Sequence, residues 1–404
     1  MFSKISRQLV KRSCAKFYGD CSENGVKTAL YDFHVKNGGK MVNFGGYLLP
    51  VQYGDHGIVK SHLFTRSHAS LFDVSHMLQT EVRGNDCGEF LESICTVDME
   101  NLQKNSAALA VFTNEKGGIL DDLIVTKISY DHLYLVSNAA RREHDQKLLT
   151  TALEIFKCKY PKADVKIQFF QPRDRSLLAL QGPKSAEILQ KFTNTHLSRL
   201  FFMKSTIASV CGVELCRITR CGYTGEDGFE ISLPSVKAED VAREILTNED
   251  VKLAGLGARD SLRLEAGLCL YGTDITEETT PIEAGLSWLI SKRRRRVLGF
   301  PGSDIIINQI NDGPIIKRIG VIFADGPPAR QGSMILDGSG SKVLGSVTSG
   351  CPAPSLGRNI AMAYVPVEFS KPNTKLCVKI RDKVYNAVVF KMPFVQTKYY
   401  LPPK

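Results

Sequence analysis

The part of the chain after residue 300 constrains the fold most strongly, because it is broken into short segments rich in β-branched residues. Gly, Pro, Asp and Asn separate these segments, which lie at residues 319–323, 334–336, 343–347, 376–380 and 384–389. Strands at such regular spacing, with few helix signals between them, are typical of a small β-barrel or sandwich. We therefore predict a separate C-terminal β domain whose boundary lies near residues 292–300.

The preceding part of the chain alternates strand and helix patterns. The predicted strands lie at 177–180, 213–219 and 229–233, and the predicted helices at 141–156, 184–192, 236–246 and 253–267. This mixed order favours α+β layers over a doubly wound parallel sheet. A chain of 404 residues also exceeds the size at which one core keeps growing, so two or three domains are expected. Residues 28–53, with glycines between apolar residues, are expected to be extended and free of helix.

Residues 109–138 predict two consecutive hairpins, with strands at 109–113, 119–128 and 132–137. If the second hairpin turns about Tyr130, counting outward places Asp122 opposite Asn138, so that a carboxylate and an amide share one face. Successive side chains on a strand point to opposite faces, and Asp121 would therefore point away from that face. At most one of the two aspartates is expected to carry chemistry.

The first twenty residues contain five Lys or Arg residues and no acid before Asp20, a pattern typical of a mitochondrial transit peptide. A disordered basic terminus is the alternative. This segment supplies part of the formal charge of +10, so removing it weakens any argument for a nucleic-acid partner. No stretch approaches the roughly 20 apolar residues that span a bilayer, and no membrane insertion is expected.

The sequence predicts neither a metal site nor a nucleotide cofactor. The eleven cysteines are scattered, without the paired two-residue spacers of zinc sites, and indicate reduced thiols in a reducing compartment. His56, His62 and His68 are spaced by six residues and so do not share a helical face. The glycines of 222–228 and 255–257 match neither the dinucleotide fingerprint nor a phosphate loop.

Two segments leave a choice open on the residues alone. Arg259 and Arg263 lie one turn apart on a predicted helix, where they could clamp an anion or instead bind neighbouring carbonyls or Glu265. Residues 220–230, RCGYTGEDGFE, could grip a ligand or form an ordinary acidic turn.

Six longer segments resemble the signature segments of aminomethyltransferases, the T-proteins of the glycine cleavage system. They are FDVSHM (72–77), GGILDDLIV (117–125), CGYTGEDGFEIS (221–232), ARDSLRLEAGLCLYG (258–272), VTSGCPAPSL (347–356) and KMPFVQTKYY (391–400). The resemblance runs from about residue 30 to the C-terminus. One departure is Tyr47, where the family often has Trp.

The resemblance implies an α+β fold, a three-domain cloverleaf with two α+β domains around a folate opening and a C-terminal β-barrel. It also implies a division into a transit peptide at 1–28, a folate-binding core of two interleaved subdomains at 29–296 and a barrel domain at 297–404. The implied location is the mitochondrial matrix.

The implied reaction transfers a one-carbon unit from the aminomethyl-dihydrolipoyl arm of the lipoylated H-protein to tetrahydrofolate, and releases ammonia. The other glycine cleavage proteins are further implied partners. Tetrahydrofolate is the co-substrate and no metal is required. Positioning and one carboxylate suffice for such chemistry, because the main task is to stabilise an iminium-like intermediate beside the folate nitrogen.

Carried over residue by residue, the family's catalytic carboxylate falls on Asp122. The implied folate-binding residues are Met77, Leu109, Val136, Asn138, Tyr223, Glu230, Arg259, Trp288 and Tyr399. Glu230 can accept hydrogen bonds from a pterin, and Arg259 can pair with a carboxylate of the folate tail. For Met77, Leu109 and Val136, core packing is the alternative on sequence alone.

Three further expectations follow. The C-terminal residues 393–400 should lie against the folate pocket, and the basic run 292–296 should either steer an acidic partner or form a solvated hinge.

A non-enzymatic folate-binding assembly or tRNA-modification factor of the same fold is the rival function. Those relatives have a Lys-Gly-Cys-Tyr loop, whereas residues 220–223 read Arg-Cys-Gly-Tyr, which disfavours that rival.

Overall fold

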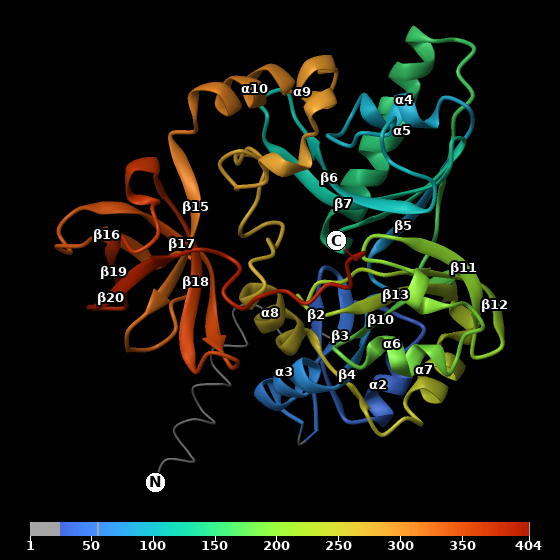
Figure 1. Ribbon diagram of the computed structural model, residues 1–404, viewed down its shortest axis with the longest axis horizontal. Coiled ribbons are helices and arrows are strands. Elements are labelled where there is room, and N and C mark those ends of the chain that lie inside the picture. Colours follow the sequence, from blue (N-terminus) through green and yellow to red (C-terminus); the bar gives the residue numbers. More distant parts are fainter. Residues whose placement is uncertain (1–24, 55, 404) are drawn as a thin grey trace.

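The computed structural model describes residues 25–54 and 56–403 (Figure 1). Most of the expected leader lies outside these residues. The described chain forms two α+β units and a C-terminal barrel (Figure 1), which confirms the predicted fold class. No helix in the described ranges is long and apolar enough to cross a membrane.

The first unit is a five-stranded antiparallel sheet in the order β6-β7-β8-β5-β9. Its strands are β5 (Leu78–Arg83), β6 (Ser106–Thr113), β7 (Ile119–Ser129), β8 (His132–Ser137) and β9 (Lys166–Phe169), and its helices are α4 (Cys87–Glu92) and α5 (Arg142–Lys159). Leu149 and Phe156 of α5 pack into the core of this unit with Phe90 of α4. The two predicted hairpins are therefore confirmed.

The pairing of β7 with β8 fixes where the central aspartates lie. Leu123 pairs with Ser137 and Ile124 with Val136, which is the predicted register. Asn138 follows the end of β8, opposite Asp122, and its amide nitrogen Nδ2 lies 2.8 Å from Oδ1 of Asp122. A register fixed by a short hairpin thus brings an amide and a carboxylate together at the end of the sheet.

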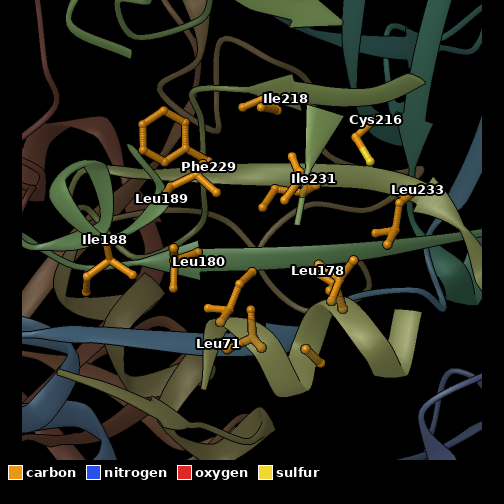
Figure 2. Packing of buried hydrophobic residues seen from close by; sticks show 14 of the residues in the cluster. Leu71, Leu178, Leu180, Ile188, Leu189, Cys216, Ile218, Phe229, Ile231 and Leu233 are labelled. Carbon is orange, nitrogen blue, oxygen red and sulfur yellow. The ribbon is translucent and has the colours of Figure 1, made fainter. Parts of the chain in front are cut away.

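The second unit is a six-stranded sheet in the order β11-β12-β13-β10-β4-β14. Its strands are β4 (Ala69–Asp73), β10 (Arg175–Gln181), β11 (Ser205–Val210), β12 (Val213–Thr219), β13 (Gly228–Pro234) and β14 (Val251–Leu253), with helices α6 (Ser185–Gln190) and α7 (Ala238–Ile245). Leu178 and Leu180 face the core that the sheet forms with α6 and α7 (Figure 2).

The opposite face of the same strand builds the centre of the molecule. Leu177 and Ala179 of β10 pack in a cluster with Val136 of β8 and with Leu262 of α8 (Leu256–Glu265). Because strand side chains alternate, one strand contributes to two cores. The two sheets therefore share a core, and their relative position is set by apolar packing.

The N-terminal segment differs from the prediction. Residues 31–36 form helix α2 (Tyr31–Lys36), followed by the strands β2 (Gly39–Phe44) and β3 (Tyr47–Tyr53), and β1 (Val26–Lys27) pairs with β3. The expectation of no helix is therefore wrong. A helix this short carries no periodic signal, and tertiary contacts hold it: Nε2 of His34 lies 2.9 Å from Asp73, and Tyr53 contacts Nδ1.

The C-terminal domain is a closed six-stranded barrel in the order β15-β18-β17-β16-β19-β20. Its strands are β15 (Ile316–Phe323), β16 (Met334–Asp337), β17 (Val343–Ala353), β18 (Arg358–Pro366), β19 (Lys375–Ile380) and β20 (Lys383–Phe390), and α9 (Lys292–Val297) and α10 (Ser303–Asp312) precede them. All five predicted strands exist. The sixth, β18, contains Ala and Met between its branched residues and was not predicted.

Helix α8 connects the barrel to the rest of the molecule through buried charges. Arg263 is 1% exposed and its guanidinium lies 2.6 Å from Asp274, while Nη2 donates to the hydroxyl of Ser349 in β17. At the end of the same helix, Glu265 accepts hydrogen bonds from Arg66 and from the hydroxyl of Ser355. These ions are desolvated, so each one depends on its partners.

We expect Arg263→Met to lower the free energy of unfolding by about 3–5 kcal/mol, because the change leaves the buried Asp274 carboxylate without its cation. The matched control is Arg243→Met, which removes an exposed pair with Glu239 and should cost less than about 1 kcal/mol. Urea unfolding of the three proteins measures both values. Equal losses in the two variants would contradict a structural role for the buried pair.

Candidate functional site

A cavity of about 690 Å³ lies where the two sheets, α8, the segment after α8 and the C-terminal tail meet. The structure brings all ten site residues expected from the sequence to its wall: Met77, Leu109, Asp122, Val136, Asn138, Tyr223, Glu230, Arg259, Trp288 and Tyr399. Acids, an arginine, aromatic rings and apolar side chains therefore meet around one space.

Asp122 presents its carboxylate to the cavity from β7. Asn138 donates from Nδ2 to its Oδ1 at 2.8 Å and to its backbone oxygen at 3.2 Å. Burial, and next the charge of Asp121, raise the pKa of Asp122 to about 7, while the amide of Asn138 and the charge of Arg259 act against this rise. A carboxyl group with such a pKa can both accept and return a proton near neutral pH.

Asp121 does not line the cavity, as expected from the alternation of the strand. It is, however, completely buried rather than exposed, and it accepts from the backbone N–H and the amide of Asn138 at 3.0 and 2.9 Å. Its substitution therefore cannot be treated as a surface change.

Glu230 is the second acid of the wall and lies on β13. Burial raises its pKa, and the nearby charge of Arg259 and a hydrogen bond with Cys221 lower it. The carboxyl group thus retains acceptor oxygens that a ligand with N–H donors could use.

The two arginines of α8 have separate roles. The guanidinium of Arg259 lies 4.6 Å from the ring centre of Tyr223, at the cavity wall, and the hydroxyl of Tyr223 donates to the backbone oxygen of Cys269. Arg263 is instead bound to Asp274 and is absent from the wall. The interpretation of the two as a joint anion clamp is therefore wrong, because the barrel engages one of them.

The C-terminal tail closes one side of the cavity. Tyr399 stacks on Phe202 with ring centres 4.0 Å apart and planes 12° from parallel. The backbone N–H of Lys398 donates to Gly225 at 2.8 Å, and that of Phe202 donates to Tyr400 at 2.8 Å. The tail crosses from the barrel to the α+β units as an ordered segment (Figure 1), so its last aromatic residues are held against the cavity.

The apolar wall residues serve two purposes. Met77 and Val136 belong to the shared core of the two sheets, and Leu109 packs beside Val111 on β6. The same side chains therefore pack in the core and line the cavity. Trp288 differs, because 65% of its surface is exposed and its ring is available at the wall.

Within the described residues there is no group of three or more His, Cys, Asp and Glu side chains that could hold a metal ion. His62, one of the three histidines spaced by six in the sequence, is buried and lies 2.8 Å from the hydroxyl of Ser261 and 3.0 Å from Glu265. It therefore belongs to the contacts between α3 (Ile58–Ser67) and α8.

Some wall residues were not predicted. Phe202 supports Tyr399, the carbonyl of Cys269 orients Tyr223, and Asp98 and Ser291 line the cavity and are hydrogen-bonded to each other. No local motif marks these positions, because their roles depend on contacts between residues far apart in the sequence.

Comparison with known proteins agrees with this architecture. The chain matches the GCVT N-terminal domain over residues 30–294 and the glycine cleavage T-protein C-terminal barrel domain over 317–396. It is 52% identical over 374 residues to the mitochondrial aminomethyltransferase of Homo sapiens, covering 93% of this chain and 91% of that protein. The mitochondrial aminomethyltransferase of Flaveria pringlei is 50% identical over 378 residues, with the same coverages.

A solved structure is also similar. The crystal structure of glycine cleavage system aminomethyltransferase T from Bartonella henselae superimposes with a TM-score of 0.86 at 37% identity, covering 93% of this chain and 99% of that one. The non-enzymatic rival has the same fold, and it is set aside because the similar sequences and the similar solved structure are aminomethyltransferases. The chain belongs to the family of glycine cleavage T-proteins, the aminomethyltransferases.

Proposed function

We propose that this enzyme transfers the one-carbon unit of an aminomethyl group, carried on the dihydrolipoyl arm of the H-protein, to tetrahydrofolate. The carbon–sulfur bond of the arm breaks, the carbon joins the folate as a methylene group, ammonia leaves and the free thiol remains. The observation that carries the proposal is the meeting of Asp122, Glu230 and Arg259 on the wall of one cavity of about 690 Å³. That volume is in the range of small-molecule sites.

The wall offers complementary contacts to a folate. Glu230 would accept from the amino and ring N–H groups of the pterin, and the aromatic faces of Tyr399 and Trp288 would pack against its flat rings. Arg259 would donate to the ligand and balance the charges of the two acids, whose pKa values it already lowers. The positions of these side chains around one cavity support the roles we propose for them.

Asp122 would act on the reacting carbon. As a carboxylate held by Asn138, it would stabilise the iminium-like cation that forms as the carbon–sulfur bond breaks, and it would accept or return a proton. The half-buried setting strengthens this interaction, because fewer water molecules screen the charge.

We propose the H-protein as the carrier, within a mitochondrial matrix enzyme system. The relatives' names support a mitochondrial location. We further propose a folate-binding core that ends at residue 296 and a barrel domain at 297–404. The leader would end before residue 25 rather than at 28, because β1 (Val26–Lys27) pairs with β3 and the hydroxyl of Thr28 donates to the buried Asp73.

The direct test is an assay of methylenetetrahydrofolate and ammonia with aminomethylated H-protein, run with and without tetrahydrofolate. Ammonia release that depends on the folate supports the proposal. Equal release without the folate, or none in either case, rejects it.

We expect Asp122→Asn to lower the single-turnover rate about a hundredfold or more under saturating folate, because the amide cannot carry the charge or accept the proton. In the parent enzyme the rate should rise with pH through about 7 as Asp122 loses its proton, and this rise should disappear in the variant. Asp131→Asn, in the turn of the same hairpin, is the control and should behave as the parent. A pH-dependent rise that survives in the Asp122→Asn variant would assign the proton to another group.

Deleting residues 397–404 should raise the dissociation constant of tetrahydrofolate about tenfold, because the deletion removes Tyr399 and one wall of the site. A change of this size corresponds to the binding free energy of one aromatic contact. Removal of residues 402–404 is the control. Isothermal titration gives the affinities, and thermal unfolding checks that each protein remains cooperative. Unchanged affinity in the longer deletion would mean that the tail is not part of the folate site.

The basic run 292–296 is helical and only partly free to steer a partner. Arg293 pairs with Asp98 at 2.7 Å and also with Glu92, and Arg294 is buried beside Glu92 at 3.1 Å. These ion pairs support an α9 that is anchored to the first unit rather than a solvated hinge. Lys292 and Arg296 remain exposed.

We expect the double change Lys292→Ala and Arg296→Ala to slow association with the acidic carrier severalfold at low salt and to flatten its salt dependence. Lys375→Ala with Lys383→Ala removes the same charge from exposed positions of the barrel and serves as the control. Stopped-flow measurement of the association rate with the H-protein over a series of salt concentrations compares the two double variants. Identical slopes for both double variants would remove the steering role of α9.

A further inference from the structure

The barrel contributes one buried cation to the cavity wall. Arg318 lies on β15 and is 8% exposed, and it is one of two arginines among the described residues of the wall. Its guanidinium donates to the backbone oxygen of Ala284 at 2.8 Å, to that of Gly267 at 3.3 Å and to the sulfur of Met362 at 3.1 Å. None of these acceptors carries a charge. Arg318 is therefore fixed in direction, but no acid of the described chain is hydrogen-bonded to it.

One nitrogen of this guanidinium remains available. Nε donates to Ala284 and Nη1 to Gly267 and Met362, whereas Nη2 has no hydrogen-bond partner in residues 25–54 and 56–403. Nη2 is not sealed from solvent, and because the residue lies at the wall, a ligand can reach it from the cavity. A buried charge costs free energy unless a partner compensates for it, and a negative group in the cavity would be such a partner.

The acid of this region, Asp274, is already paired. Its backbone oxygen accepts from Tyr364, which lies opposite Arg318 on the adjacent strand β18. Its carboxylate accepts from three side chains: Arg263 at 2.6 Å, Ser349 at 2.9 Å and Thr348 at 2.5 Å. Burial raises the pKa of Cys269 to about 11 and also raises that of Tyr364, so neither side chain supplies a negative charge near neutral pH. A ligand is therefore the remaining source of a negative group.

One apolar cluster connects the surroundings of Arg318 with Asp122. Val111 pairs with Asp122 on the adjacent strands β6 and β7. It packs in the same cluster as Ala284, whose carbonyl holds Arg318. Further members of this cluster line the cavity, namely Leu109, Cys269, Ile275, Leu286 and Leu289. An aliphatic arm can pack against such a surface, where few water molecules screen the charges at its borders.

The proposed reaction creates a negative charge that Asp122 cannot stabilise. As the carbon–sulfur bond of the neutral aminomethyl thioether breaks, its electron pair stays on sulfur, and the lone pair of the amine forms the iminium double bond. A thiolate anion and an iminium cation result. The two N–H protons that tetrahydrofolate loses on binding the carbon end on the sulfur and on the ammonia. A carboxylate favours the cation, so the anion requires a donor with a positive charge.

We propose that Arg318 is a further catalytic residue, whose Nη2 donates to the sulfur of the dihydrolipoyl arm and stabilises the leaving thiolate. The proposal rests on the proposed function and adds to it the group that balances the anion. Arg259 is less suited to this task, because it lies beside Tyr223 and already acts on both acids of the wall. Asp122 and Arg318 would thus stabilise the two opposite charges that develop on carbon and on sulfur.

The protonation state of the arm tests the proposal directly. We use the H-protein with a dihydrolipoyl arm that is isotope-labelled at the carbon next to the reacting sulfur. Its thiol pKa should be lower by about one unit or more when the carrier is bound to the full chain than when it is free, because a cation favours the thiolate. Magnetic resonance titration of the labelled carbon measures both values without turnover. A bound thiol pKa equal to that of the free carrier overturns the proposal.

Arg318→Gln should return the bound thiol pKa to that of the free carrier and lower the single-turnover rate about a hundredfold, because the amide keeps a donor but not the charge. Arg318→Lys keeps the charge and should recover the rate to within about tenfold of the parent. Lys317→Gln removes the same charge from the exposed neighbouring residue of β15 and is the matched control. Thermal unfolding and the dissociation constant of tetrahydrofolate, which should stay within about twofold in all variants, check that the fold is retained.

A purely structural role of Arg318 has a different signature. It would lower the rate or the stability of Arg318→Gln while the bound thiol pKa stays that of the parent, and this result rejects the proposal. A variant that only weakens carrier binding also rejects it, because Arg318 would then contact another part of the arm. If the parent releases no folate-dependent ammonia, the proposed function fails instead, whereas a lowered thiol pKa that is lost in Arg318→Gln still assigns the sulfur contact to Arg318.

Discussion

Helix α8 is the constraint on which the arrangement of the molecule depends, because its charged residues engage three different parts of the structure. Arg263 binds Asp274 and the barrel strand β17, and Glu265 binds Arg66 of α3 and the loop that holds Ser355. Arg259, one turn before Arg263, reaches the cavity. Buried ions are costly unless paired, so this helix fits only when all three parts are in place. The cavity is consequently assembled by the same contacts that dock the barrel.

Apolar packing and hydrogen bonding determine different features of the cavity. The alternation of β10 directs Leu178 toward one core and Leu177 toward the core shared by the two sheets, and Val136 belongs to both the shared core and the wall. Such packing fixes distances between sheets but not the directions of polar groups. Those directions come from Asn138 for Asp122 and from the carbonyl of Cys269 for Tyr223. Both of these polar groups of the wall are thus held by a second residue.

Much of the fold could be predicted because its signals are local. Counting residues outward from the turn of the hairpin gives the register that places Asn138 opposite Asp122. Five barrel strands were predicted from runs of β-branched residues that lie between turn residues. Helix α2 and strand β18 could not be predicted in the same way, since contacts with distant residues stabilise the first and small residues weaken the pattern of the second. The separate roles of Arg259 and Arg263 depend on the barrel, which spacing on one helix cannot reveal. For the site, the resemblance to a family identified residues such as Met77, which the sequence alone would have assigned to the core.

Burial is the common cause of the electrostatic character of the site. It raises the pKa of Asp122 and of Glu230, although both side chains lie within the influence of Arg259. In a wetter cavity the two acids would be ionised at lower pH and their interactions with a cation would be weaker. The apolar residues that form the shared core therefore also determine the proton affinity of the acids. A single carboxylate becomes effective against a developing cation because its surroundings exclude water while Asn138 holds its direction.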